Sequence, residues 1–174
     1  VNELATLEIL IIIFSISSSI LDAFAHSAES TVGNCIGSKN PQELKKCIKY
    51  SSEVAFIFSL LISLCLFIFE RQIFILITDI QDLLELLKSL WIYVIFTPII
   101  SVLAFQLDGI FIGATLAKHM RNSMILSAAI FYILIEFFLN EILNLENLYI
   151  CFLFFLLSRG IILSLSMKNV FALA

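Results

Sequence analysis

Asp108 is a carboxylate inside the long apolar stretch 105–115. Placing an ionised side chain in a bilayer costs about 2.5–3.5 kcal/mol on insertion scales, so such a residue usually faces a bundle interior or a water-filled cavity. Gln106 and Gly109 flank it, and Pro98 precedes it by about three helical turns. Interrupted helices are where transporters bind substrates and coupling ions. We therefore predict that Gln106 and Asp108 line a transport cavity.

The alternative for Asp108 is a structural role. In that case it pairs permanently with Arg121, Arg159 or a backbone donor and holds helices together. Arg159, inside the last apolar segment, is the expected counter-charge. Its long side chain could instead reach the membrane interface. Both interpretations stay open at this point.

Asp22, His26 and Glu29 follow one another at positions i, i+4 and i+7. A helix advances about 100° per residue, so the three side chains share one face within about 60°. Small Ala and Ser residues surround them, as close packing around a wet cavity requires. Histidine titrates near neutral pH and could relay protons with neighbouring carboxyls. We predict that all three side chains project into the bundle and line the cavity; the alternative is that this half-helix emerges among the cytoplasmic headgroups.

The composition predicts an integral membrane protein. Hydrophobic residues make up 61% of the 174 residues and charged residues only 14%, and the mean hydropathy is +1.08. The net charge of −4 offers no basic surface, so no nucleic-acid partner is expected. We expect no enzyme activity, metal or cofactor, because no soluble-enzyme motif appears and the cysteines lack metal-ligand spacing. The four cysteines are Cys35, Cys47, Cys65 and Cys151.

Five apolar segments, each near the roughly 20 residues that cross a bilayer, predict an all-α polytopic helix bundle with residues 1–174 as a single membrane domain. The segments are expected at about 4–36, 54–69, 91–116, 124–139 and 148–167. Asn40 and Pro41 predict the start of the second helix, and Asp79 is expected to cap the third. Gly37 predicts a left-handed helix end. The segment 158–160 is expected to interrupt the last helix.

Lysine and arginine gather in the loops of one side, around 39–49, 118–121 and 168, whereas the other side has only Arg71 and Lys88. The positive-inside rule therefore predicts a multi-pass protein of the inner (plasma) membrane, with the N-terminus outside and the C-terminus cytoplasmic. An outside start without a signal sequence requires an upstream helix, so we expect a fragment of a longer protein.

At these residues the chain resembles the multidrug and toxic compound extrusion (MATE) family, nearest to its DNA-damage-inducible (DinF-like) branch. The matching pieces are 22–29, 32–37, 106–115 and 120–124. The resemblance implies the carboxy-terminal lobe of a two-lobe transporter, helices eight to twelve of twelve. It also implies a secondary antiporter that exports small organic compounds, driven by H⁺ or Na⁺. The implied partners are the lipid bilayer, those substrates and a missing amino-terminal lobe.

Asp108 matches the tenth-helix aspartate that the sodium-driven branch of this family links to cation coupling. Two other functions remain open: a non-functional remnant of a split or decayed transporter gene, and a MATE-related flippase for a lipid-linked substrate. An intramembrane enzyme is disfavoured, because no nucleophile or metal set accompanies the polar residues at 22–29. The substrate and the choice between H⁺ and Na⁺ cannot be read from the sequence.

Overall fold

The computed structural model describes residues 2–139 and 144–173, which form helices joined by short turns. The helices are α1 (Asn2–Gly37), α2 (Pro41–Ile68), α3 (Glu70–Ile77), α4 (Gln81–Gly113), α5 (Ala117–Leu139), α6 (Leu145–Leu165) and α7 (Met167–Phe171). Within these described residues, five stretches are long and apolar enough to cross a membrane: α1, α2, α4, α5, and α6 together with α7. The predicted all-α, five-span bundle is therefore confirmed.

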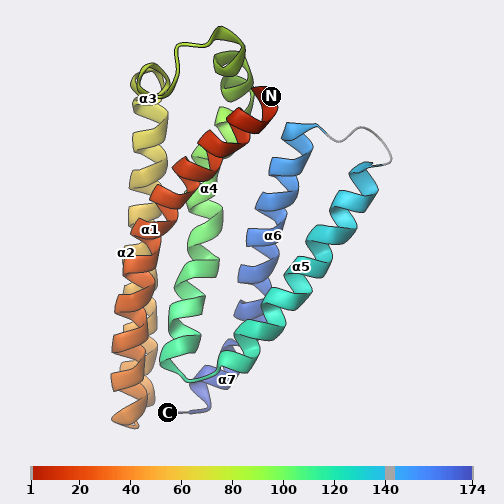
Figure 1. Cartoon of the computed structure of the whole chain (residues 1–174). Coiled ribbons are helices and arrows are strands. Elements are labelled where there is room, and N and C mark those ends of the chain that lie inside the picture. Colours follow the sequence, from red (N-terminus) through yellow and green to blue (C-terminus); the bar gives the residue numbers. More distant parts are fainter. Residues whose placement is uncertain (1, 140–143, 174) are drawn as a thin grey trace.

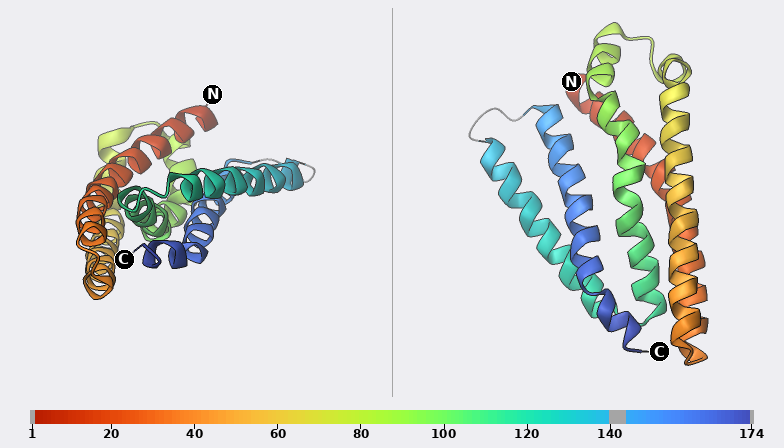
Figure 2. Two further views of the ribbon diagram at one scale, coloured as in Figure 1. Left: turned by 90° about the horizontal axis from the view of Figure 1, so that it is seen from below. Right: turned by 180° about the vertical axis from the view of Figure 1, so that it is seen from behind.

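Helix α4 lies at the centre of the bundle and packs against α1, α2 and α6. Figure 1 shows α1 and α2 side by side along one flank, and α5 on the opposite flank. Figure 2 shows from behind that α6 lies between α4 and α5. The N-terminus and the C-terminus lie at opposite ends of the bundle. A topology with one terminus on each side of a membrane requires this arrangement.

Two glycines one turn apart let α1 approach α4 closely. A Cβ atom at Gly109 would lie 2.1 Å from the backbone oxygen of Ala25, and one at Gly113 would lie 2.4 Å from the backbone oxygen of Glu29. No side chain fits at those distances. The Gly-x-x-x-Gly pattern is the small-residue motif that brings membrane helices into backbone contact. It fixes the polar segment of α1 directly beside the segment of α4 that carries Asp108.

In the turn between α1 and α2, the predicted Asn40 cap is present, but the predicted left-handed conformation of Gly37 is not. The Asn40 side chain accepts hydrogen bonds from the backbone N–H groups of Gln42 and Glu43, so the predicted helix cap is confirmed. The predicted left-handed conformation at Gly37 is wrong, because Lys39 adopts it with a φ of 52°. Helix α1 simply continues through Gly37, whose missing side chain faces open space.

Two other predicted helix boundaries are also wrong. Helix α4 begins at Gln81 with Ile80 at its N-cap, so Asp79 is not the cap. Instead the Thr78 hydroxyl oxygen accepts a hydrogen bond from the Ile80 N–H. Helix α6 runs without a break through 158–160. Gly160 serves packing there, since a Cβ atom at this position would lie 2.9 Å from the side chain of Leu103 on α4.

Candidate functional site

An ion pair joins α4 to α6 inside the bundle. The Arg159 guanidinium donates a hydrogen bond from Nη2 to Oδ2 of Asp108. The Asp108 side chain is 13% exposed and that of Arg159 17%. Asp108 lies near the end of α4, which stops at Gly113. Arg159 is thus the counter-charge of Asp108, as expected from the sequence. Its side chain does not extend to the membrane interface, which was the alternative.

The pair leaves hydrogen-bonding capacity unused on both sides. Oδ1 of Asp108 and Nε of Arg159 are buried and have no hydrogen-bond partner among the residues that the structure describes. A buried charged group normally has all its hydrogen bonds satisfied, and an unsatisfied one costs free energy. The second carboxylate oxygen therefore has unused capacity to accept a proton.

Two further polar contacts connect α4 to α6 above the ion pair. The Tyr93 hydroxyl donates to Oε1 of Glu146 at 2.7 Å, and the hydroxyls of Thr97 and Tyr149 lie 2.9 Å apart. The Thr97 hydroxyl donates a hydrogen bond to the backbone oxygen of Tyr93, so its oxygen accepts the hydrogen bond that the Tyr149 hydroxyl donates. The sequence separations are 53 and 52, and that of the ion pair is 51. These three contacts are called the α4–α6 polar ladder below.

Sequence reasoning missed the upper two contacts of the ladder. Their signal was present in the spacing: Tyr93 and Thr97 are four residues apart on one helix, and Glu146 and Tyr149 are three apart on the other. Side chains at such spacings share a helix face. The contacts between these two pairs of residues could not be predicted, because the sequence does not show that α4 and α6, separated by α5, pack against each other.

Asp22 lies close enough to Asp108 for their charges to interact electrostatically. The glycine contact between α1 and α4 explains this proximity, because Gly109 packs on Ala25 one turn after Asp22. Asp22 therefore lies near the Asp108 carboxylate, which Arg159 of α6 contacts directly. The sequence predicted both carboxylates as site residues but not that they lie close together.

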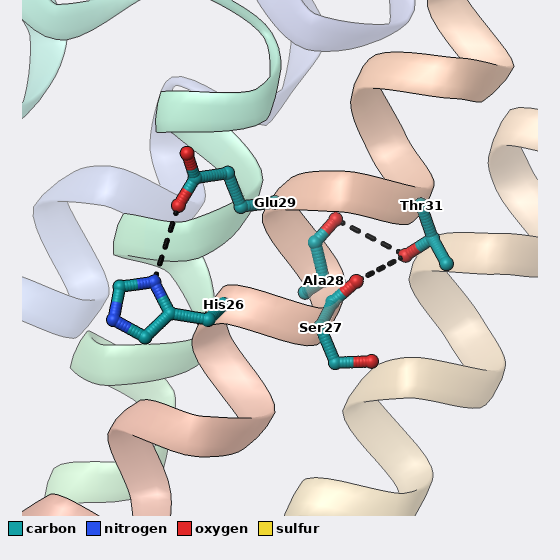
Figure 3. Close-up of polar contacts among 5 residues, drawn as sticks. All are labelled: His26, Ser27, Ala28, Glu29 and Thr31. Carbon is teal, nitrogen blue, oxygen red and sulfur yellow. Dashed lines mark hydrogen bonds and ion pairs between the residues drawn. The ribbon is translucent and has the colours of Figure 1, made fainter.

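His26 and Glu29 form a second polar contact on α1. His26 Nδ1 lies 3.3 Å from Oε2 of Glu29 (Figure 3). A carboxylate only accepts hydrogen bonds, so the imidazole carries the proton on Nδ1 in this contact. The His26 side chain is 76% exposed and that of Glu29 38%. Thr31 turns to the other side, where α2 lies, and its hydroxyl donates to backbone oxygens of α1.

The helices of this chain therefore do not enclose the face that carries Asp22 and His26, both of which are exposed. The predicted cavity would need a second wall, so its lining by these residues stays a prediction. Among the described residues, no group of three or more His, Cys, Asp or Glu side chains has an arrangement that could hold a metal ion.

Gln106 lies in a different interface from Asp108. Its side chain is buried, at 4% exposure, and Nε2 donates to the Ser51 hydroxyl of α2 at 3.0 Å. Residues two apart on a helix point about 200° from one another, so Gln106 faces α2 while Asp108 faces α6. Oε1 of Gln106 has no partner among the described residues. The side chains of Gln106 and Asp108 thus project from opposite faces of α4.

Comparison with known proteins agrees with these features. The sequence model of the MatE family matches residues 1–140. The chain is 30% identical over 121 residues to DNA damage-inducible protein F of Escherichia coli (strain K12), a match that covers 70% of this chain and 26% of that protein. The chain thus spans about a quarter of the length of this relative. No solved structure matches the chain significantly. The family model covers most of the chain, and the structure is a helical bundle with five candidate membrane spans. The chain therefore belongs to the MatE family.

Proposed function

We propose that the chain forms the carboxy-terminal lobe of a secondary antiporter that exports small organic compounds, and that Asp108 is its cation-exchange group. The observation that carries this proposal is the buried Asp108 carboxylate, of which one oxygen accepts a hydrogen bond from Arg159 and the other has no partner among residues 2–139 and 144–173. A permanently structural ion pair would be expected to use both oxygens, as bidentate arginine–carboxylate pairs do. Family membership supplies the transport context.

The exchange step uses the ion pair as a switch. A proton on Oδ1 of Asp108 removes the negative charge, so the guanidinium of Arg159 loses its electrostatic partner. The lowest contact of the α4–α6 polar ladder then weakens, while the two hydroxyl contacts above it remain. Helix α6 can therefore pivot on α4 at the Asp108 end. Loss of the proton restores the pair and reverses the movement.

Arg159 favours a proton over a sodium ion as the exchanged cation. A sodium ion at Oδ1 would lie beside the positive guanidinium, which repels it, and would need several further oxygen ligands. A proton adds no such requirement, because it binds one carboxylate oxygen covalently. Asp22 nearby supplies a second carboxylate through which the proton could leave.

Transport by alternating access requires two lobes that rock about a shared cavity. We propose that the exposed face of α1, with Asp22, His26 and Glu29, faces an amino-terminal lobe across that cavity. Two observations support this: the match covers 26% of the length of the relative, and Asp22 and His26 on this face are exposed in the described part of the chain. The proposed location is the inner (plasma) membrane, with the lysine-rich end at Lys45 in the cytoplasm.

The experiment is efflux of a cationic dye from cells that express either these 174 residues alone or together with a matching amino-terminal lobe. We expect efflux at the level of empty vector for the chain alone, and energy-dependent efflux for the pair. Efflux by the chain alone would refute the two-lobe mechanism. A pair that inserts and assembles but exports no dye would favour a remnant. Movement of a lipid-linked substrate instead of dye would favour a flippase.

A further inference from the structure

Cys35 and Cys47 bring their sulfur atoms together where α1 passes into α2. Their Sγ atoms lie 2.7 Å apart, and both thiols are reduced. A disulfide bond has an S–S length of about 2.05 Å and requires the two Cβ atoms to face one another. The two side chains already face one another across the helix pair. No large backbone movement is needed to join them.

The helix geometry explains this meeting. Helix α1 ends at Gly37 and α2 begins at Pro41, so the chain reverses within a few residues and the two helices run antiparallel. Cys35 stands in the last turn of α1, and Cys47 in the second turn of α2. Cys35 is buried in the apolar cluster at this end of the bundle, and Cys47 packs against the same cluster. Twelve residues separate the two, a spacing that carries no recognisable motif.

The two cysteine residues differ in exposure. Cys47 is partly exposed and lines a groove of about 450 Å³ between α1 and α2, which Thr31 and Lys46 also line. Cys35 lies behind it and is 9% exposed. A small oxidant can therefore reach Cys47 first, while Cys35 stands ready to attack the oxidised sulfur. An accessible cysteine that reacts with the oxidant, next to a buried cysteine that then forms the disulfide, is the arrangement found in redox-sensing cysteine pairs.

We propose that Cys35 and Cys47 form a reversible disulfide in response to peroxides. The Cys47 thiol releases its proton, and the thiolate attacks one peroxide oxygen. The O–O bond breaks, a sulfenic acid forms on Cys47, and the other oxygen leaves as hydroxide, which the released proton converts to water. The Cys35 thiol then attacks the Cys47 sulfur. The S–S bond forms, and the sulfenic oxygen leaves as a second water with the thiol proton. The two thiols together give two electrons to one peroxide molecule, which is reduced to water.

The bond would tie the last turn of α1 to the second turn of α2. It would bypass the connection at 38–40, in which Lys39 takes the left-handed conformation. Both tied turns pack against α4 in the same apolar cluster. The disulfide thus restrains the α1–α2 pair at one end of the bundle, two turns from Glu29. It is a property of this chain and does not depend on the transport proposal.

The test counts free thiols in membranes that contain the whole chain. The membranes are washed with dithiothreitol, treated or not with hydrogen peroxide, and then dissolved in SDS with a polyethylene-glycol maleimide, which adds one mass step per thiol. We expect all four cysteines to react before peroxide, two after it, and four again once dithiothreitol is restored. Mass spectrometry should identify one linked peptide pair that contains Cys35 and Cys47.

Single variants separate a disulfide from simple oxidation. Cys47→Ser should keep its three remaining thiols reactive at the same peroxide dose, whereas Cys35→Ser should lose at most one, because Cys47 still forms a sulfenic acid that dithiothreitol reduces. The matched control is the double variant Cys65→Ser/Cys151→Ser, which should lose both of its remaining thiols on treatment. The proposal is overturned if peroxide leaves all wild-type thiols reactive at a dose that oxidises added glutathione. It is equally overturned if Cys35→Ser loses thiols as wild type does, or if the bond persists after the dithiothreitol wash.

Discussion

Asp108 on α4 and Arg159 on α6 form the last contact of a parallel polar ladder between the two helices. Each contact joins residues separated by 53, 52 or 51 positions, so the register between the helices is almost constant along their length. Each of the two upper contacts has a hydroxyl donor, whereas the last joins two charged side chains. A change of charge at Asp108 therefore acts on one end of a helix pair whose other end stays fixed.

The strength of the ion pair can be measured by a double-mutant cycle. Arg159→Met should destabilise the detergent-solubilised protein by about 3 kcal/mol, because it leaves the buried Asp108 carboxylate without a partner. The double variant Asp108→Leu/Arg159→Met should recover most of that loss, since no unpaired charge remains. Thermal melting followed by circular dichroism gives each value. If the double variant loses as much stability as Asp108→Leu and Arg159→Met lose separately when added together, the two residues are not coupled and the ladder ends at Tyr149.

The contact between α1 and α4 predicts a large effect of one added methyl group. Gly109→Ala should lower stability by about 3 kcal/mol, because the new Cβ atom collides with the backbone of Ala25 and forces the helices apart. Gly37→Ala is the matched control, since a Cβ atom there meets nothing within 4 Å. It should leave stability unchanged or raise it by up to about 1 kcal/mol, because alanine favours the helix over glycine. Equal melting temperatures for the two variants would show that the close approach is not needed.

Much of the fold follows from the sequence because each helix carries its own signal. The five apolar stretches predict the five spans, and Asn40 before Pro41 predicts the start of α2, which the structure confirms. The errors occur where local preference yields to packing. The segment 158–160 was predicted to interrupt α6, but the helix continues through it, and the absent side chain of Gly160 leaves room for Leu103 of α4. Single-residue preferences carry no information about such a neighbour.

The candidate site was predicted residue by residue but not as an arrangement. Burial cost alone identifies Asp108, and helical spacing places His26 and Glu29 on one helix face, where the structure brings them into contact. The approach of Asp22 to Asp108 depends on how closely α1 packs against α4, which is a tertiary property. Gln106 illustrates the limit most clearly: two positions from Asp108, it faces α2 and not α6. The predicted common cavity for all five residues stays a prediction.

The proposed orientation predicts which end of the bundle reacts with an impermeant reagent. In a cysteine-free variant, Lys45→Cys at the start of α2 should react with a charged maleimide only after the cells are permeabilised. Lys88→Cys near the start of α4 should react in intact cells. Both positions are exposed, so a lack of reaction reports sidedness and not burial. The reverse pattern would place the N-terminus in the cytoplasm and overturn the proposed topology.

The role of Asp108 is tested by one isosteric substitution in the assembled two-lobe transporter. Asp108→Asn keeps the size of the side chain but cannot bind and release a proton. Asp79→Asn is the matched control, because Asp79 is an exposed carboxylate outside the ladder. Both variants should reach the membrane in wild-type amounts, which blotting of the membrane fraction verifies.

The decisive measurement is dye export driven by an imposed pH gradient in vesicles that contain wild type, Asp108→Asn or Asp79→Asn. We expect the Asp108→Asn rate to fall at least about 100-fold, to the level of empty vesicles, because an exchange of the coupling proton needs a titrating group. The Asp79→Asn rate should equal that of wild type. If Asp108→Asn exports dye at the wild-type rate under the same gradient, Asp108 only holds α4 to α6 and proton exchange takes place elsewhere in the transporter.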